Sequence, residues 1–480
     1  MRVRPVTSRP PGAVPLSTRL LYGCGTMAFG IKDQGFNALL MLFYNQVIGL
    51  PAAWVGAAIM IAMIADALFD PLLGHFSDNF RSRLGRRHPF MYAAALPIAL
   101  SYLLLWMPPV ASHGAQFAWL VTTAIIVRFS ISLYEIPSTA LLAEFTSDYD
   151  ERTRLVAARY FFGVCGGALM MVITFGYLLR PAPAQPVGHL NAGGYVTYAW
   201  VAAAIMLASV LISSFGTQKE ALKQPPPARA ARVSPARMLR DIAGILVHPA
   251  YVAILLASLF FAIAAGLGSA LGIYFLTYFW ELSAGQIATL ASVSMVGILL
   301  AFVVALPLAA RFDKKAAAML MFGVALLSNV ALLILRLAGL LPANADPLLI
   351  WLLRAQVAVT IMATISGSIL AVSMIADVTD QIRLETGRRA EGLLFSAATM
   401  INKAVSGMGI LSSGLLLSFV NFPEHARPGH VAGDVLHRLA GIYVGATALV
   451  TALAIACLAC YPVTRSWHRE NIRRLGRDAG

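Results

Sequence analysis

The sequence predicts an all-α membrane protein that carries twelve transmembrane helices in two six-helix bundles. Of its 480 residues, 59% are hydrophobic and 12% are charged, and the mean hydropathy is +0.75. Soluble domains carry about 25% charged residues, so this composition indicates a polytopic membrane protein. Apolar segments of about 20 residues or more, long enough to cross about 30 Å of hydrocarbon, recur along the chain. The loops between these segments alternate in charge.

The expected spans fall into two groups of six. The segment between the two groups contains three consecutive prolines among several Lys and Arg residues, which is typical of a polar, partly flexible linker. We therefore expect a cytoplasmic N-terminal tail at 1–17, an N-terminal bundle at 18–217, a cytoplasmic linker at 218–247, a C-terminal bundle at 248–464 and a cytoplasmic basic tail at 465–480. The spans are expected near 18–49, 52–78, 88–108, 115–145, 153–179, 194–217, 248–280, 284–311, 314–340, 345–378, 390–421 and 435–464.

Loop charge predicts the topology. The net charge of +14 is concentrated in alternate loops, as the positive-inside rule requires, and this placement argues against a nucleic-acid-binding surface. Both termini are therefore expected on the cytoplasmic side of a bacterial-type inner (plasma) membrane. The first 19 residues lack the apolar region of a cleavable signal peptide, so the first span is expected to direct insertion. The basic loops are near 81–87, 152–159, 311–315 and 383–389, and the loops near 49–53, 108–115, 181–193, 280–285 and 341–347 contain no Lys or Arg.

Asp66 and Asp70 are the central feature of the second expected span. They are four residues apart, so on a helix their Cβ atoms lie roughly 5–6 Å apart on one face. An ionised carboxylate inside a membrane costs on the order of 2.5–3.5 kcal/mol, and two like charges this close need a compensating cation. We interpret the pair as a site for a coupling cation or proton. The alternative is that both acids reach water at the helix end, but Asp66 lies too deep in the span.

The loop after this span carries a candidate gate. Gly74-His-Phe-Ser-Asp78 is followed by Arg81-Ser-Arg-Leu-Gly-Arg86-Arg87. Asp78 is expected to pair with nearby arginines or with the cytoplasmic end of a facing helix, and such pairs hold one access state. The alternative is that these charges only set the topology. The candidate gating residues are Asp78, Arg81, Arg86 and Arg87.

Two further charged residues lie inside expected spans. Glu135, two residues before Pro137, is costly in the fourth span and is interpreted as a third carboxylate of the cation site. The alternative is an ion pair with Arg128, which lies seven residues earlier. Lys403 lies in the middle of the eleventh span and needs a partner, which we expect to be a carboxylate of the N-terminal half.

These features together resemble one family. Asp66-x-x-x-Asp70-Pro, the arginine-rich loop, Glu135 and Lys403 occur in this order in the glycoside–pentoside–hexuronide:cation symporters (melibiose permease-like) of the major facilitator superfamily, and the chain is identified as a member. The resemblance covers nearly the whole chain. It implies two bundles that rock around a substrate near the membrane midplane. It also implies that Asp66, Asp70, Glu135 and Ser132 bind the cation.

Three features depart from the family pattern. Gly30 stands where the family has a sugar-binding aspartate, and nearby Lys32 and Asp33 are candidates for a replacement site or for an internal ion pair. Phe69 stands where the family has an asparagine ligand, so an oxygen ligand is lost and a proton is favoured over sodium. Arg159 lies one residue before the family's sugar-contacting arginine, and it fits better with a branch that moves lysophospholipids.

The substrate site is expected to combine charged and aromatic side chains. Tyr134 is a candidate for stacking on a sugar ring, although aromatic residues at helical spacing more often belong to the core. Glu135 is expected to serve both the cation and the substrate. The candidate substrate-binding residues are Glu135, Lys403, Asp33, Lys32, Arg159 and Tyr134.

These patterns predict a secondary active transporter that couples movement of a sugar or glycoside to a cation or proton. A lysophospholipid or other amphiphile is the alternative substrate, and a non-transporting membrane sensor is the third class. No metal-ligand cluster, nucleophile–base spacing or phosphate-binding loop predicts an enzyme. We expect no cofactor other than the coupling ion, Na⁺ or H⁺. The expected partners are a small-molecule substrate, the cation and membrane lipid, with no nucleic acid, and the family implies a monomer.

Overall fold

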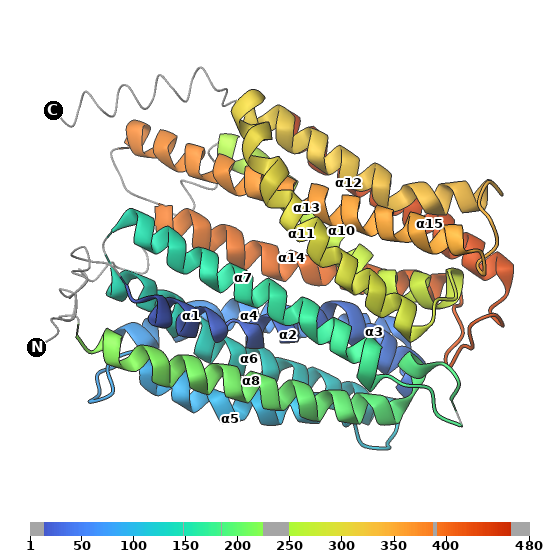
Figure 1. Cartoon of the computed structure of the whole chain (residues 1–480), viewed down its shortest axis with the longest axis horizontal. Coiled ribbons are helices and arrows are strands. Elements are labelled where there is room, and N and C mark those ends of the chain that lie inside the picture. The colour runs from blue at the N-terminus through green and yellow to red at the C-terminus, as the bar shows by residue number, and fades with distance from the viewer. Residues whose placement is uncertain (1–13, 147, 184, 224–248, 387–390, 462–480) are drawn as a thin grey trace, which may run out of the picture.

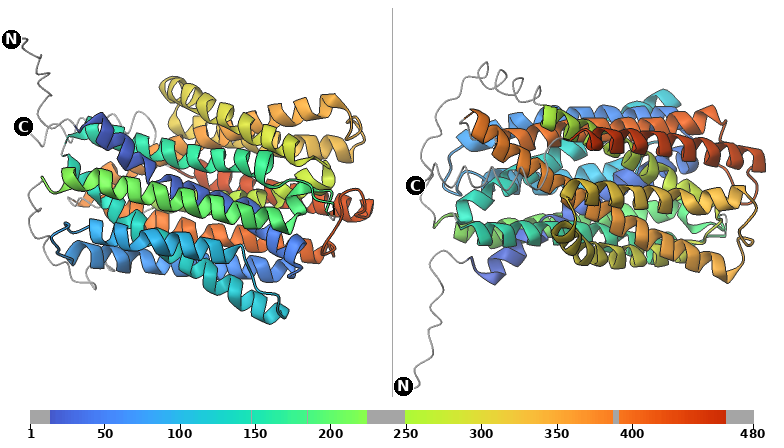
Figure 2. Two further views of the ribbon diagram at one scale, coloured as in Figure 1. Left: turned by 60° about the horizontal axis from the view of Figure 1, so that its bottom comes forward. Right: turned by 90° about the horizontal axis from the view of Figure 1, so that it is seen from above.

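The computed structural model describes residues 14–146, 148–183, 185–223, 249–386 and 391–461. Ten helices of this described part are long and apolar enough to cross a membrane, so the chain is a multi-pass membrane protein and the predicted all-α class is confirmed. The helices run along the long axis of the molecule (Figures 1 and 2). The expected basic tail and nearly all of the expected linker and N-terminal tail lie outside the described residues.

The N-terminal half contains the first expected group of spans. Its helices continue to residue 221, slightly past the expected end of the bundle. In Figure 1 these helices are coloured blue to green and lie below the other half. The long helices are α4 (Ala52–Asn79), α5 (His88–Leu105), α6 (His113–Phe145), α7 (Tyr149–Ile173) and α8 (Ala192–Ala221), with short helices η3 (Thr174–Leu178) and η4 (Gly188–Leu190) between the last two.

The C-terminal half contains the second group, coloured yellow to red in Figure 1. Helix α14 of this half packs against α4 and α10, so it joins the two halves. The elements are α10 (Pro249–Tyr274), η5 (Phe275–Phe279), α11 (Ala284–Arg311), α12 (Lys314–Leu337), α13 (Pro347–Thr386), α14 (Glu391–Phe419) and α15 (Gly433–Ala459).

The first expected span is interrupted. Thr26 Oγ1 donates to the carbonyl of Gly23 at 2.7 Å and lies at 2.7 Å from the carbonyl of Arg159 on α7. A side chain that bonds to backbone carbonyls competes with helical bonding, and the helix breaks at this point. Two π-helical segments follow, and such segments are frequent at functional sites. The elements are α1 (Leu16–Cys24), α2 (Met27–Gln34), η1 (Gly35–Leu39), α3 (Leu40–Leu42) and η2 (Phe43–Ile48).

Helices α4 and α14 run antiparallel and form a close contact between the halves, which we call the seam. A Cβ atom on Gly414 would lie 2.3 Å from the carbonyl oxygen of Ala52, and one on Gly407 would lie 3.2 Å from the Cα of Met60. Small residues let the two backbones approach closely, as is usual between membrane helices. The seam therefore runs from the start of α4 toward its aspartates.

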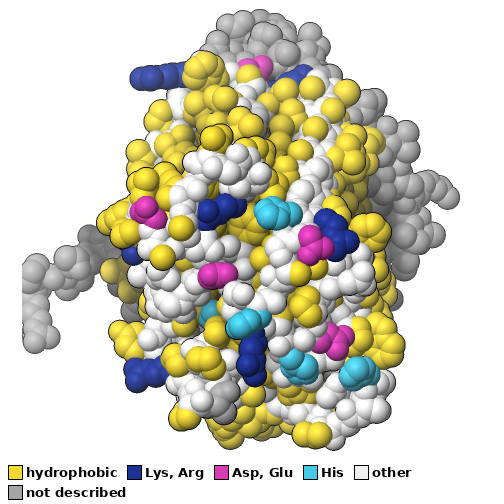
Figure 3. Space-filling model, turned by 90° about the vertical axis from the view of Figure 1, so that its right-hand side faces the viewer, with side chains coloured by type: hydrophobic (Ala, Val, Ile, Leu, Met, Phe, Trp, Pro, Cys, Tyr) yellow, Lys and Arg dark blue, Asp and Glu magenta, His cyan; other side chains and the backbone are white. Residues whose placement is uncertain are grey.

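The end of the molecule that carries the loops 179–191 and 420–432, on the right in Figure 1, is called the distal end. Here neutral hydrogen bonds join the two halves, and Gln46 of η2 is their centre. Its Nε2 donates to the carbonyl of Pro423 at 3.1 Å, and its Oε1 accepts from Ala426 N at 2.9 Å and from the Tyr278 hydroxyl at 3.0 Å. Figure 3 shows this end, where charged and histidine side chains lie among hydrophobic ones. Further cross-half bonds join Tyr274 to Asn45, His425 to Gln46 and Thr277 to His189.

Replacement of Gly30 by Ala is expected to destabilise the protein. The added Cβ would lie 1.9 Å from the carbonyl oxygen of Gly163, so α2 and α7 must separate, and overpacking of this kind costs about 1–3 kcal/mol. Gly272→Ala is the matched control, because nothing lies within 4 Å of its Cβ and Ala is favoured over Gly in helices by about 0.5–1 kcal/mol. Thermal unfolding of the purified protein measures both, and an unchanged midpoint for Gly30→Ala would contradict the packing of α2 on α7.

Candidate transport site

Asp66 lies at the centre of a buried charge cluster at the inner end of the seam. Both Asp66 and Arg128 of α6 are only 3% exposed. Arg128 Nη1 donates to Asp66 Oδ2 at 3.1 Å, and the guanidinium also lies over the ring of Phe36, 4.8 Å from its centroid. This arginine neutralises the aspartate where ionisation alone would be costly. Arg128 therefore pairs with Asp66. The alternative considered from the sequence, an ion pair between Arg128 and Glu135, is not formed.

Lys403 of α14 completes the cluster from the other half. Its Nζ donates to Asp70 Oδ2 at 2.6 Å and lies 3.4 Å from Asp66 Oδ2. The side chains of Asp70 and Lys403 are 21% and 27% exposed, so this pair is more open to solvent than the Asp66–Arg128 pair. Lys403 thus pairs with carboxylates of the N-terminal half, which is the arrangement that the sequence predicts for the eleventh span.

Ser132 bridges the two aspartates. Its Oγ lies 2.8 Å from Asp66 Oδ1 and 2.7 Å from Asp70 Oδ1. A hydroxyl has one proton to donate, so it satisfies one ionised carboxylate fully and leaves the other facing an oxygen lone pair. A proton on that second carboxyl group would turn the contact into a hydrogen bond. The geometry of these three side chains therefore suits a protonated as well as an ionised pair.

Lys32 and Asp33 of α2 lie beside this cluster. Lys32 is buried, with its Nζ 3.5 Å from Asp33 Oδ1 and 4.3 Å from the centroid of the Phe29 ring. It also interacts electrostatically with Asp66 and Lys403. Of the two alternatives expected from the sequence, a replacement substrate site or an internal ion pair, this geometry is that of the ion pair.

Glu135 belongs to a second ion pair. One of its carboxylate oxygens accepts from Arg159 of α7. Arg159 also donates to Ser138 Oγ at 2.6 Å and to Thr139 Oγ1 at 2.9 Å. The other oxygen, Glu135 Oε2, is buried and has no hydrogen-bond partner among the described residues. Glu135 is therefore neutralised by Arg159 of α7. Its role as a cation ligand beside Asp66 and Asp70 stays a prediction.

A cavity of about 400 Å³ opens beside this second pair, between the first span, α6 and α7. Glu135 and Arg159 form part of its wall, and Asp33 and Tyr160 line it as well. Its volume falls within the range of about 300–1,000 Å³ that is usual for small-molecule sites. The remaining lining residues are Tyr22, Thr26, Phe29, Gly30, Gln34, Thr139, Leu142, Val156, Gly163, Val164 and Gly167.

Tyr134 does not reach this cavity, which corrects its prediction as a sugar-stacking residue. The side chain is buried, and its hydroxyl donates to Ser213 Oγ of α8 at 2.8 Å. A Cβ atom on Gly25 would lie 1.7 Å from the Tyr134 hydroxyl, so a glycine is required where α1 ends. Tyr134 is one residue before Glu135 and therefore points about 100° away around the helix.

The candidate gating loop forms its ion pairs within the N-terminal half. Arg87 Nη2 lies 2.5 Å from Asp78 Oδ1, and Glu144 at the end of α6 accepts from Arg86 at 2.7 Å and from Arg87 at 3.3 Å. Arg81 is exposed and forms no ion pair among the described residues. Sequence reasoning missed Glu144, although an acid at the cytoplasmic end of an expected span next to a basic loop is a readable signal.

His189 is a fully buried titratable side chain at the distal end. It belongs to the loop between α7 and α8, and its Nε2 lies 2.9 Å from Thr277 Oγ1 of the other half. Its Nδ1 has no hydrogen-bond partner among the described residues. Burial lowers the pKa of His189 from 6.5 to about 4, so the closed distal end contains a neutral ring.

Comparisons with known proteins give the chain a family context. Residues 21–465 match the family described as MFS/sugar transport protein. The isoprimeverose transporter of Lactiplantibacillus pentosus is 26% identical over 422 residues, which cover 84% of this chain and 80% of that protein. An uncharacterized symporter of Synechocystis sp. is 32% identical over 238 residues, 48% of this chain and 42% of that protein, so the chain spans less than half the length of that relative.

Two further comparisons bear on fold and substrate. The crystal structure of a D-xylose-proton symporter has a TM-score of 0.61 at 16% identity, covering 91% of this chain and 96% of that one. At this identity the likeness shows the fold alone, and the fold is that of major facilitator transporters. A sphingosine-1-phosphate transporter of Mus musculus is 23% identical over 428 residues, 86% of this chain and 83% of that protein.

Replacement of Asp66 by Asn is expected to destabilise the protein by about 3–5 kcal/mol, because it leaves the buried Arg128 without a counter-charge. The double replacement Asp66→Asn with Arg128→Met removes both charges and is expected to recover most of the loss. Asp434→Asn is the matched control, since Asp434 forms an exposed pair with Arg438 and such pairs contribute about 0–1 kcal/mol. Thermal unfolding measures all three, and a double variant no more stable than Asp66→Asn would contradict the pairing.

Acidification is expected to open the distal end. When water reaches His189 its pKa returns toward 6.5 from about 4, so the closed form loses stability as the pH falls through this window. Between pH 7.5 and 5 the ratio of closed to open molecules should fall roughly 30-fold. Spin labels at the exposed positions Ala192 and Glu424, one on each half, report the change as a longer distance. His189→Gln should reduce the pH dependence by the part that this ring contributes, and equal pH profiles in both proteins would rule out this role.

Proposed function

Because the chain belongs to the MFS/sugar transport protein family, we propose that it is a secondary active transporter that moves a neutral sugar or glycoside together with a proton. Members of this fold alternate between two states in which a central site opens to either side of the membrane. The proposed substrate class rests on the buried Glu135 Oε2 beside the cavity, which has no hydrogen-bond partner in the described part of the chain. The choice of a proton as the coupling ion rests on Asp66 and Asp70, the two aspartates that Ser132 bridges.

The cavity beside Glu135 and Arg159 is the proposed substrate site. Glu135 Oε2 lacks a donor among the described residues, and a buried acceptor without a partner costs about 1–3 kcal/mol. A sugar hydroxyl supplies such a donor without adding charge, so the Glu135–Arg159 pair keeps its neutrality. Tyr160 in the lining is exposed and offers an apolar face for a sugar ring.

Asp70 is the proposed site of proton uptake. It is the more exposed of the two aspartates, and Ser132 Oγ contacts both carboxylates at hydrogen-bond distance. Phe69 packs on Phe129, with ring centroids 5.3 Å apart, and offers no oxygen to a metal cation. These contacts favour a proton over sodium. The two carboxyl groups share their neighbours, so titration belongs to the pair rather than to one residue.

Protonation of Asp70 is proposed to release the seam. In the present state Lys403 neutralises Asp70, and this pair ties α14 to α4 at the inner end of the seam. A proton on Asp70 removes the nearer of the two carboxylate charges that hold Lys403 and leaves the longer contact with Asp66, whose charge is shared with Arg128. The tie between the halves is then weaker, and the halves can rock. If the halves separated while Asp70 was deprotonated, its carboxylate would lose Lys403 and remain poorly solvated. This cost disfavours movement of the carrier without a bound proton.

The distal end is proposed to face outward. Its loops contain few Lys and Arg residues, whereas the opposite loops are basic. With the distal hydrogen bonds formed, the present state is closed to the outside of a bacterial-type inner membrane. Both termini are then cytoplasmic, as the sequence predicts.

A phosphorylated amphiphile is the second candidate substrate, because a sphingosine-1-phosphate transporter is among the relatives and because Arg159 lines the cavity. A phosphate group would have to displace Glu135 from Arg159 and leave a carboxylate without its partner. The neutral sugar needs no such exchange and is therefore preferred.

Uptake into proteoliposomes tests the proposal. We expect isoprimeverose or another neutral glycoside of a test panel to accumulate under an inward proton gradient and not under a sodium gradient alone. Asp70→Asn should lose at least tenfold of the gradient-driven accumulation while still exchanging the same sugar, because the amide mimics the protonated acid. Asp434→Asn, an exposed acid outside the site, should behave as the wild type.

Two results of this assay would overturn parts of the proposal. Accumulation driven equally well by sodium at constant pH would exclude the proton as the required ion. Uptake of sphingosine-1-phosphate or a lysophospholipid that no sugar inhibits would exclude the sugar as substrate and favour the second candidate.

A further inference from the structure

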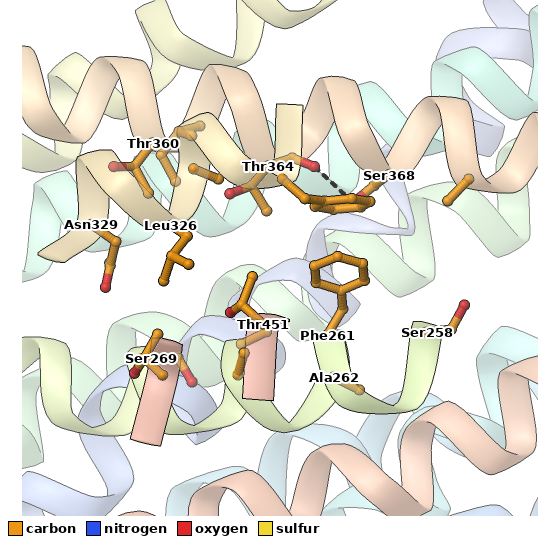
Figure 4. Close-up of a pocket in the computed structure, with 18 of the residues that line it drawn as sticks. Ser258, Phe261, Ala262, Ser269, Leu326, Asn329, Thr360, Thr364, Ser368 and Thr451 are labelled. Atoms are coloured by element: carbon orange, nitrogen blue, oxygen red, sulfur yellow. Dashed lines mark hydrogen bonds between the residues drawn. The ribbon is translucent and has the colours of Figure 1, made fainter. Parts of the chain in front are cut away.

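We infer that the C-terminal half contains a second binding site, separate from the proposed transport site, for a neutral ligand with an apolar body and a few hydroxyl groups. A cavity of about 610 Å³ lies among α10, α12, α13 and α15 (Figure 4), and Asn402 of α14 also lines it. All of its described lining residues belong to this half. The inference therefore goes beyond the proposed function, which uses the other half and the seam.

Polar side chains follow two helix faces into this cavity. Thr360, Thr364 and Ser368 recur every fourth residue on α13, and Thr447 and Thr451 do so on α15. Residues four apart share a helix face, so each helix presents a stripe of hydroxyl groups. Figure 4 shows Thr360, Thr364 and Ser368 along one helix, with Thr451 across from them. Stripes on facing helices can bind hydroxyl groups at several points of one ligand.

The polar groups of the wall retain unused hydrogen-bonding capacity. Thr447 is 5% exposed, and its hydroxyl lies near the Tyr443 hydroxyl but makes no hydrogen bond of standard length and angle among the described residues. Asn329 Oδ1 accepts from the Tyr443 hydroxyl at 2.8 Å, which leaves the Nδ2 donors of Asn329 for a ligand. A buried hydroxyl without a partner costs about 1–3 kcal/mol, and a ligand oxygen would remove this cost.

The remaining wall is apolar and aromatic. The rings of Phe261 and Phe322 are stacked, with centroids 3.6 Å apart and planes inclined by 27°. A Cβ atom on Gly367 would lie 2.9 Å from Phe322 Cε1, so glycine makes room for this ring. Figure 4 shows Phe261 near the middle of the cavity. The aromatic pair suits the apolar body of a ligand.

Charge and size define the class of ligand. No Asp, Glu, Lys, Arg or His lines the described part of the cavity, so a charged ligand would lose its hydration without compensation. The volume lies within the usual range for small-molecule sites. Two sources supply neutral molecules with apolar bodies and hydroxyl groups, namely soluble aryl glycosides and monoacylglycerols of the membrane. The test includes one probe from each source.

Binding stoichiometry of the full-length protein in nanodiscs tests the inference. The probes are 4-nitrophenyl β-D-glucopyranoside, measured by equilibrium dialysis, and 1-monooleoylglycerol, measured by native mass spectrometry. Ala262→Leu fills the cavity from α10, and Thr364→Val with Thr451→Val removes two hydroxyl groups at constant volume. Ala452→Leu on the exposed side of α15 is the control. We expect the wild type to bind one probe per chain at this site. The affinity for this probe should fall at least tenfold in both cavity variants and less than twofold in the control.

The outcomes separate this site from the transport site. If both sites bind the glycoside, the wild type takes two molecules per chain and the cavity variants take one. If the transport site takes a different substrate, the wild type takes one and the cavity variants take none. Binding of the glycoside alone identifies a soluble source, and binding of the glycerolipid alone identifies the membrane. Unchanged binding in both cavity variants, or no binding of either probe to folded wild type, overturns the inference.

Discussion

The ion pairs from Lys403 to Asp70 and Asp66 are the interactions on which the rest of this structure depends. Lys403 belongs to α14 of one half and both aspartates belong to α4 of the other, with Nζ–Oδ2 distances of 2.6 and 3.4 Å. Elsewhere along the seam, glycines of each helix lie against the backbone of the other, and these contacts provide packing without charge. A single change of protonation therefore acts at the place where the two halves are joined.

Buried charges elsewhere in the N-terminal half are matched in pairs. Arg128 neutralises Asp66, and Arg159 neutralises Glu135. Such pairs are tolerated in low dielectric only when each charge keeps its partner and its hydrogen bonds. An arriving cation would be an excess charge unless it displaced a resident base. Lys403 is the base suited to displacement, because its side chain is more exposed than those of Arg128 and Arg159 and its helix belongs to the other half.

The sequence predicts the components of the site better than their pairing. Hydropathy and loop charge are sufficient to predict the all-α membrane fold. The spacing of Asp66 and Asp70 is sufficient to predict that both lie on one face of their helix. The partner of Glu135 could not be predicted, because it depends on how α6 is rotated toward α7, and neither expectation named Arg159 as that partner. The broken first span and the distal network around Gln46 were also missed, because side-chain hydrogen bonds to distant backbone groups leave no periodic signal.

The two junctions between the halves differ in kind, and this difference can order the transport cycle. At the distal end neutral hydrogen bonds around Gln46 close the molecule, and each contributes about 0.5–1.5 kcal/mol net. Several such bonds can break one after another at moderate cost, because water replaces each partner. The Lys403–Asp70 pair is only partly exposed, so separating its two charges costs more than breaking a neutral hydrogen bond, and a proton or cation at Asp70 would lower that cost. On the proposed mechanism, opening of the distal end is then limited by proton binding at the seam, and this binding, rather than the hydrogen bonds, determines when the halves exchange.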